Sequence, residues 1–192
     1  IDFIIDVVLN SKNEIIHACS GEWKQAHAEA KHYLDSLYRQ VIPFEADIVI
    51  LSAGEGEDGS LYEIIPALEN AVNAVRKDGV LILAGECAEG FGNDLLCQWL
   101  KQYRQPEKLL SAVGTQFDRG IARAAATAIA RRKAEIYLVS SMNPDEIKET
   151  MLKPFSLLSN AYERAVRKCG KAAKTIVIHD GNHVMPELKN SR

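Results

Sequence analysis

Four short apolar runs, separated by stretches with helical periodicity, constrain the fold of this chain more than any other feature. Strands that are buried on both faces read as continuous apolar runs and are typical of parallel sheets. Strands that alternate with helices indicate an α/β fold. The pattern therefore predicts a mainly parallel sheet flanked by helices, a Rossmann-like sandwich. The runs are IVIL after Asp47, VLILAG at 80–85, EIYLVSS at 135–141 and KTIVIHDG at 174–181.

The first 45 residues follow a different pattern. IDFIIDVVLN and NEIIHACSG each resemble a strand, and the polar residues 11–13 between them favour a hairpin. Apolar residues then recur at three- and four-residue steps from Glu22 to Gln40, which indicates an amphipathic helix. Because the chain starts at Ile1 inside a strand-like run, we expect a fragment of a longer protein. Residues 1–45 would join a missing N-terminal domain, and residues 46–192 would form the α/β C-terminal domain.

Helices are expected between the apolar runs. A helical face at 67–75 is followed by Lys77-Asp78-Gly79, where the glycine would end the helix. Further helices are expected at 95–102 and on both sides of Gly114 within 107–133. A long helix from 145 to 168 would be interrupted near Pro154.

Composition excludes several classes of protein. The net charge of −3 and pI near 6.0 provide no electrostatic footprint for nucleic acid. No apolar stretch approaches the roughly 20 residues of a membrane span, and no signal peptide is recognisable. The four cysteines show no CxxC spacing, so we expect reduced thiols in a cytoplasmic protein.

Ligands of open α/β sheets bind outside the carboxyl ends of the strands. Three segments of this chain follow strands in that way, and the first is the best candidate. Its Gly54-x-Gly56-x-x-Gly59 pattern matches a dinucleotide fingerprint, but the carboxylates of Glu55, Glu57 and Asp58 would repel a phosphate. The segments are Ser52–Ser60, Gly85–Asn93 and Ser140–Asn143.

Ser60 and Glu63 have the spacing of a capping box at the start of a helix. Glu63 is therefore a candidate either for a helix cap or for a ligand contact. Pro66 would either kink this helix or begin the main helix as its first residue.

The five histidines indicate no metal site. His27 and His32, five residues apart, do not share a helix face, whereas His179 and His183 flank a turn and have the better spacing for a metal. Because His179 and His183 lack a carboxylate-rich partner, we expect no metal ligands in this chain. No catalytic triad order or nucleophile elbow is present either, so these residues alone do not identify a reaction.

The order of the segments resembles the C-terminal half of the nickel-dependent lactate racemase family. The resemblance lies in IDFIIDVVLNSKNEIIHACSGEWKQAHAEA, in ADIVILSAGEGEDGSLYEIIPALENAVNAVRKDGVLILAGECAEGFG and in the ending KTIVIHDGNHVMPEL. The strongest pieces are the S-A-G loop followed by LY, the DGVLIL strand and the E-C-x-E-G-x-G turn. No piece is diagnostic by itself, but together their order and spacing cover essentially the whole chain.

This resemblance implies a two-domain enzyme with its active site between the domains. Family members racemise or epimerise 2-hydroxy acids by hydride transfer with a nickel-pincer nucleotide. The nickel ligand, the tethering lysine and the paired acid-base histidines belong to the N-terminal half, so we expect no catalytic residue in this fragment and no cofactor bound by it alone. The expected partners are the N-terminal domain of the same protein and a small 2-hydroxy acid.

The chain departs from the family where that family faces its substrate. Glu63 stands in place of a glutamine and Pro66 in place of a lysine, and Gln116 and Phe117 match a glutamine followed by a tryptophan. Because Glu63 would repel a substrate carboxylate and Pro66 cannot pair with one, we expect a substrate other than lactate, with a polyol or cationic tail. The substrate- or cofactor-facing candidates are Ser52, Gly54, Glu63, Gln116 and Phe117.

Other interpretations remain open at this stage. In one alternative, the parent protein keeps the fold but has lost lactate-type catalysis. In another, its chemistry depends wholly on residues upstream of this chain. A further alternative is a noncatalytic Rossmann-like domain that binds a ligand or acts as a scaffold. An upstream nickel-ligand histidine and a tethering lysine in the full-length gene product would distinguish the enzyme from this module.

Overall fold

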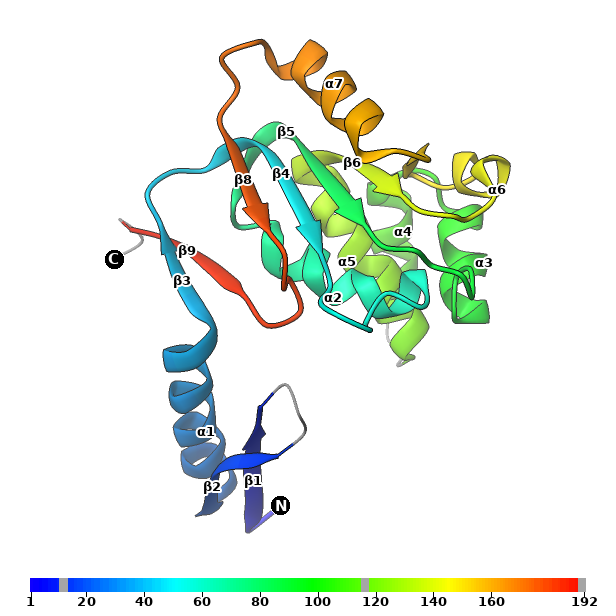
Figure 1. Ribbon diagram of the computed structural model, residues 1–192. Coiled ribbons are helices and arrows are strands. Elements are labelled where there is room, and N and C mark those ends of the chain that lie inside the picture. Colours follow the sequence, from blue (N-terminus) through cyan, green and yellow to red (C-terminus); the bar gives the residue numbers. More distant parts are fainter. Residues whose placement is uncertain (11–13, 115–117, 190–192) are drawn as a thin grey trace. The chain divides into compact units, whose positions relative to one another are not determined.

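The computed structural model describes residues 1–10, 14–114 and 118–189 (Figure 1). The chain divides into two compact units, Ile1–Gln40 and Val41–Arg192. The sequence placed a boundary at residue 45, a few residues further along. No helix among the described residues is both long and apolar enough to cross a membrane.

The first unit is a hairpin covered by one helix. Strands β1 (Ile4–Leu9) and β2 (Ile15–Gly21) pair in antiparallel register, and α1 (Trp23–Tyr38) packs on one of their faces. The Glu22 carboxylate caps α1, since it accepts hydrogen bonds from the backbone N–H groups of the second and third helical residues at 3.0 and 3.1 Å. The predicted hairpin and helix are confirmed.

The second unit is built on a five-stranded parallel sheet in the order β7-β6-β5-β4-β8 (Figure 1). The four apolar runs of the sequence supply its four longer strands, so the predicted parallel sheet is confirmed. A separate pair, β3 (Arg39–Ile42) with β9 (Met185–Leu188), was not predicted. The sheet strands are β4 (Ala46–Ser52), β5 (Val75–Ala84), β6 (Ala134–Val139), β7 (Lys153–Phe155) and β8 (Thr175–Ile178).

Helices cover both faces of this sheet. Alternate residues of β4 point to opposite faces: Ile48 belongs to the core with α7, and Val49 belongs to the larger core with α2, α3, α4 and α5. The same alternation along β5 and β6 gives the sandwich two cores. The helices are α2 (Leu61–Ala71), α3 (Asp94–Gln102), α4 (Pro106–Val113), α5 (Arg119–Lys133), α6 (Pro144–Lys148) and α7 (Leu158–Cys169).

The prediction that Lys77-Asp78-Gly79 ends a helix is wrong. These residues lie within β5, where the pairing with β4 shifts register and Asp78 has a φ of 63°. A Cβ on Gly79 would lie 2.8 Å from the carbonyl oxygen of Asp47 on the neighbouring strand. Glycine is therefore needed here because two backbones approach closely at a strand irregularity.

The two prolines that complicated the helix assignments lie in different settings. Pro154 occupies β7 at the edge of the sheet, so α6 and α7 are separate helices rather than one interrupted helix. An edge strand tolerates proline because one side of the strand has no ladder partner. Pro66 lies inside α2, which begins at Leu61, so the alternative in which the helix starts at Pro66 is wrong.

Candidate functional site

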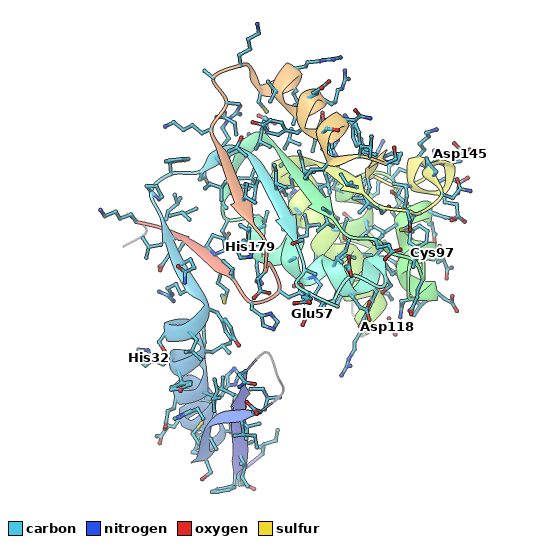
Figure 2. The ribbon with its side chains drawn as sticks, in the orientation of Figure 1. His32, Glu57, Cys97, Asp118, Asp145 and His179 are labelled. Atoms are coloured by element: carbon cyan, nitrogen blue, oxygen red, sulfur yellow. The ribbon has the colours of Figure 1, made fainter. Side chains whose placement is uncertain are left out.

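The three loops that follow β4, β5 and β6 meet at the carboxyl ends of these strands, because the strands pair in parallel. We call this side of the sheet the carboxyl edge. They surround an open hollow of about 550 Å³. Figure 2 shows Glu57 and His179 on the side toward which the arrowheads of β4 and β8 point. The hollow is lined by Ser52, Asp58, Ala84, Gly85, Glu86, Val139, Ser140, Ser141 and Ser156.

Hydrogen bonds connect these loops to each other. The Asp58 carboxylate accepts from the backbone N–H of Glu86 at 3.1 Å, and the Asp58 carbonyl accepts from the N–H of Cys87 at 2.8 Å. From the third loop, the Ser141 hydroxyl donates to the Glu86 carbonyl at 2.7 Å. The acidic loop after β4 thus uses Asp58 to hold its neighbour, and this carboxylate has a structural role.

Glu63 acts as the helix cap that the sequence allowed. Its Oε2 accepts a hydrogen bond from the backbone N–H of Ser60 at 3.0 Å, as in the capping box. The Glu63 side chain is otherwise exposed. Capping therefore engages one carboxylate oxygen of Glu63, and its contact with a ligand stays a prediction.

Ser52 and Gly54 link β4 to the segment after β8. The Ser52 hydroxyl donates to the carbonyl of His179 at 3.0 Å, and its carbonyl accepts from the N–H of Gly181 at 2.8 Å. Gly54 has a φ of 152°, and a Cβ there would lie 3.0 Å from the Asp180 carboxylate. Both residues therefore hold the segment after β8 against the acidic loop, and their contacts with a ligand stay predictions.

This terminal segment brings a side-chain cluster to the edge that the sequence did not predict. His183 Nδ1 lies 3.0 Å from the Asp180 carboxylate, and its Nε2 lies 4.0 Å from the Glu57 carboxylate. Asn182 Nδ2 donates to the second oxygen of Glu57 at 2.6 Å. The sequence did contain a signal, because β8 is the last apolar run. Once β8 pairs in parallel with β4, the residues after β8 must lie beside the loop that follows β4.

Asn182 also contacts the first turn of α2. Asn182 Nδ2 donates at 3.4 Å to the carbonyl of Glu63 in that turn. Its Oδ1 is buried and accepts no hydrogen bond from the described residues. The side chain thus fastens the terminal segment to the first turn of α2.

Cys87 is the one cysteine at this edge. Burial, followed by the carboxylates of Asp58, Glu63 and Glu86, raises the pKa of its thiol to about 12. Cys87 also has a φ of 52°, in the left-handed region that non-glycine residues seldom adopt. A neutral, buried thiol is a poor nucleophile, so Cys87 serves packing in the turn.

The predicted candidates Gln116 and Phe117 lie outside the described residues. A second hollow of about 680 Å³ lies among α2, α4 and α5 and is lined by Tyr62, Glu69 and Arg123 among others. The Arg123 guanidinium is 5.6 Å from the centre of the Tyr62 ring and donates to Glu69 at 2.7 Å. This arginine is therefore already paired with an acid.

The carboxyl edge of the sheet is rich in acidic side chains. The described segments 52–63, 85–94, 140–143 and 179–183 contain neither lysine nor arginine, and His179 and His183 are their only basic side chains. Such an edge disfavours anions at close range and favours cations or hydroxyl donors. The carboxylates are Glu55, Glu57, Asp58, Glu63, Glu86, Glu89, Asp94 and Asp180.

Comparisons with known proteins give a consistent result. Residues 41–185 match the family model of the lactate racemase C-terminal domain. The lactate racemase of Thermoanaerobacterium thermosaccharolyticum is 27% identical over 194 residues, which cover 97% of this chain and 45% of that protein. The lactate racemase of Lactiplantibacillus plantarum is 26% identical over 186 residues, which cover 93% of this chain and 43% of that protein. The chain thus spans slightly less than half of the relatives it matches.

Solved structures agree with the sequence comparisons. The lactate racemase apoprotein from T. thermosaccharolyticum superposes with a TM-score of 0.83 at 25% identity, over 97% of this chain and 46% of that one. A protein from Thermotoga maritima superposes with a TM-score of 0.66 at 15% identity, over 97% of this chain and 49% of that one. The second match supports the fold alone.

Proposed function

Because this chain belongs to the family of lactate racemase C-terminal domains, we propose that it is the C-terminal half of a racemase or epimerase of 2-hydroxy acids. The observation that carries this proposal is the family match over residues 41–185. These residues include the S-A-G loop, the E-C-x-E-G-x-G turn and the segment 179–183 after β8. In the structure these pieces meet at one edge of the sheet, the usual position of a ligand in an α/β fold.

The cofactor proposed for the whole protein is a nickel-pincer nucleotide, which would accept a hydride from the α-carbon of the substrate and return it. The carboxyl edge of this chain does not fit the phosphate of such a nucleotide. Its segments contain no lysine or arginine, and Asp58 and Glu63 already accept hydrogen bonds from backbone N–H groups that would otherwise face an anion. We therefore assign cofactor binding to the N-terminal half and derive no step of the reaction through this chain.

The same charges support a substrate other than lactate. Glu57, Glu63 and Asp180 present carboxylates at this edge, which favour a cationic or hydroxyl-rich tail over a second anionic group. The carboxylate of a 2-hydroxy acid would then be bound by basic residues of the N-terminal half. The role proposed for this chain is to orient the tail and to close one side of the active site.

The partner proposed for the first unit is the N-terminal half of the same protein. Alternate side chains of β1 and of the residue before it are exposed and apolar: Phe3, Ile5, Val7 and Leu9 are 63%, 74%, 42% and 40% exposed. The intervening Ile4 and Val8 pack against α1. A contiguous apolar strand face of this kind marks an interaction surface, and the relatives are more than twice as long as this chain.

An isomer-exchange assay on the full-length holoprotein tests the proposal. Single enantiomers of 2-hydroxy acids with anionic, neutral, polyol and cationic tails would be incubated in deuterated water and followed by chiral chromatography. We expect inversion of a polyol or cationic substrate, with the deuterium content of the α-carbon reporting whether hydrogen returns without exchange. No inversion of any acid in the panel, by protein shown to carry its cofactor, would contradict the proposal and favour a noncatalytic module.

A further inference from the structure

A cluster of potential metal ligands lies within the first unit. His17 and Cys19 are two residues apart on β2, so their side chains point to the same face, and Glu29 lies on α1, which packs on that face. One ligand atom from each of the three residues lies within 4.8 Å of the others. All three belong to Ile1–Gln40, so the cluster is complete within one compact unit.

The spacing of these atoms suits a tetrahedral metal ion. With metal–nitrogen and metal–oxygen bonds of about 2.1 Å, two tetrahedral ligands lie about 3.4 Å apart. His17 Nε2 and Glu29 Oε1 are 3.4 Å apart. A thiolate sulfur at about 2.3 Å from the metal would lie about 3.6 Å from each of these two atoms. In the structure Cys19 Sγ lies within 4.8 Å of both, so each of these distances would need to shorten by at most about 1.2 Å.

The hydrogen bonding of His17 is a second, independent observation. His17 Nε2 is buried and makes no hydrogen bond to any described residue, although it faces Glu29. The ring is held in this orientation by Tyr33, whose ring stacks on it with centroids 4.3 Å apart and an interplanar angle of 12°. Buried nitrogen atoms are rarely left without a partner. A metal ion at this position would provide one.

Cys19 is positioned to exchange a weak hydrogen bond for a metal bond. Its thiol lies in the core of the unit and donates to the carbonyl of Ala26 at 3.1 Å. A bound zinc ion would displace the thiol proton to solvent, as in other thiolate sites.

The small core of the unit gives such an ion a structural purpose. Val8, Cys19, Ala26 and Ala30 are the buried hydrophobic residues of this core among the described residues. Units of about 40 residues usually need a disulfide, a metal or a partner for stability. A metal held by β2 and α1 together would fasten the hairpin to its helix.

We propose that His17, Cys19 and Glu29 bind one Zn²⁺ ion through imidazole nitrogen, thiolate sulfur and carboxylate oxygen. Thiolate and imidazole ligands select zinc over magnesium or calcium. The Glu29 side chain is 63% exposed, so the fourth coordination position is open to water. No residue of the carboxyl edge takes part, and the site is independent of the function proposed for the second unit.

The first experiment measures metal binding by the 192-residue chain after removal of metal with a chelator. We expect one Zn²⁺ per chain, and with Co²⁺ a thiolate charge-transfer band together with intense visible bands of tetrahedral geometry. Cys19→Ser should abolish the charge-transfer band, and both Cys19→Ser and His17→Gln should weaken affinity roughly 100-fold or more. Glu29→Gln changes an exposed residue, so it should fold normally and still weaken affinity roughly tenfold or more.

Matched controls come from the same chain. Cys169→Ser removes a thiol of the second unit, and His32→Gln removes an exposed imidazole of α1 (Figure 2). Both should bind Zn²⁺ as the unsubstituted chain does. Equal affinity in the Cys19→Ser, Glu29→Gln and control variants would overturn the proposal and leave His17 and Glu29 as neighbouring side chains only.

A stability readout separates a built site from surface binding. In a Trp99→Phe background, the fluorescence of Trp23 at the start of α1 reports on the first unit alone. We expect a saturating concentration of Zn²⁺ to raise the thermal midpoint of this signal, because the ion binds the folded unit. The rise should be absent in Cys19→Ser and present in Cys169→Ser. A rise of the same size in both variants would contradict the assignment.

Discussion

Replacement of Glu63 tests how the acidic loop is joined to α2. In the structure one Glu63 oxygen accepts the N–H of Ser60 at the start of the helix. Glu63→Ala removes that hydrogen bond, which contributes about 1 kcal/mol, and a negative charge in the first turn, which contributes about 0.3–1 kcal/mol. We therefore expect a loss of about 1–2 kcal/mol. Glu63→Gln keeps an acceptor and removes only the charge, so it should cost about 0.3–1 kcal/mol.

The assay is urea unfolding of the second unit, followed by the fluorescence of Trp99 in a Trp23→Phe background. Trp99 is 7% exposed, so its emission changes when the larger core opens. With a slope of about 1–3 kcal/mol per M of urea, 1 kcal/mol corresponds to a shift of about 0.3–1 M in the urea midpoint. Glu55→Ala is the control, because it removes an exposed acid of the same loop that caps no helix. Equal stability of Glu63→Ala and Glu55→Ala would refute the capping role.

Three further predictions follow from contacts of the second unit. Gly181→Ala should destabilise it by about 1–3 kcal/mol in the same assay, because a Cβ would lie 2.6 Å from the Ala67 side chain; an unchanged midpoint would contradict the packing described. Burial alone would raise the pKa of Glu135, but Lys153 and Lys168 lower it to about 2. This carboxylate therefore stabilises the fold fully above pH of about 4.5 and less as the pH falls toward about 2. Glu135→Gln should cost about 1–2 kcal/mol at pH 7 and progressively less in acid, and a cost independent of pH would contradict this. In full-length holoprotein, Glu63→Gln should shift substrate preference away from cationic or polyol tails, whereas unchanged selectivity would assign Glu63 to capping alone.

The sheet could be predicted because parallel strands buried on both faces need continuous apolar runs. The same reasoning failed wherever a glycine or proline had two possible roles. Gly79 follows a helical pattern and resembles a helix end, yet it allows two backbones to approach within β5. Pro154 resembles a helix break, yet it lies in an edge strand. Local sequence does not show which distant backbone lies opposite such a residue.

The candidate site shows a similar limit. The acids after β4 were recognised, but Asn182 and His183, the partners of Glu57, were not, because they lie more than 100 residues away in sequence. Only the position of β8 beside β4 places these side chains at the loop. Glu63 was recognised both as a cap and as a possible ligand contact, and the cap is present. The ligand contact of Glu63 stays a prediction, which the full-length holoprotein would test.

Intact-mass spectrometry and metal analysis of the full-length gene product, isolated from its native cells, test the central claim most directly. We expect a protein that carries a covalently attached nucleotide and about one equivalent of nickel, both in the N-terminal half proposed for the whole protein. A protein of unmodified mass without nickel, purified under conditions that preserve a lactate racemase holoenzyme as a control, would contradict the proposed racemase function.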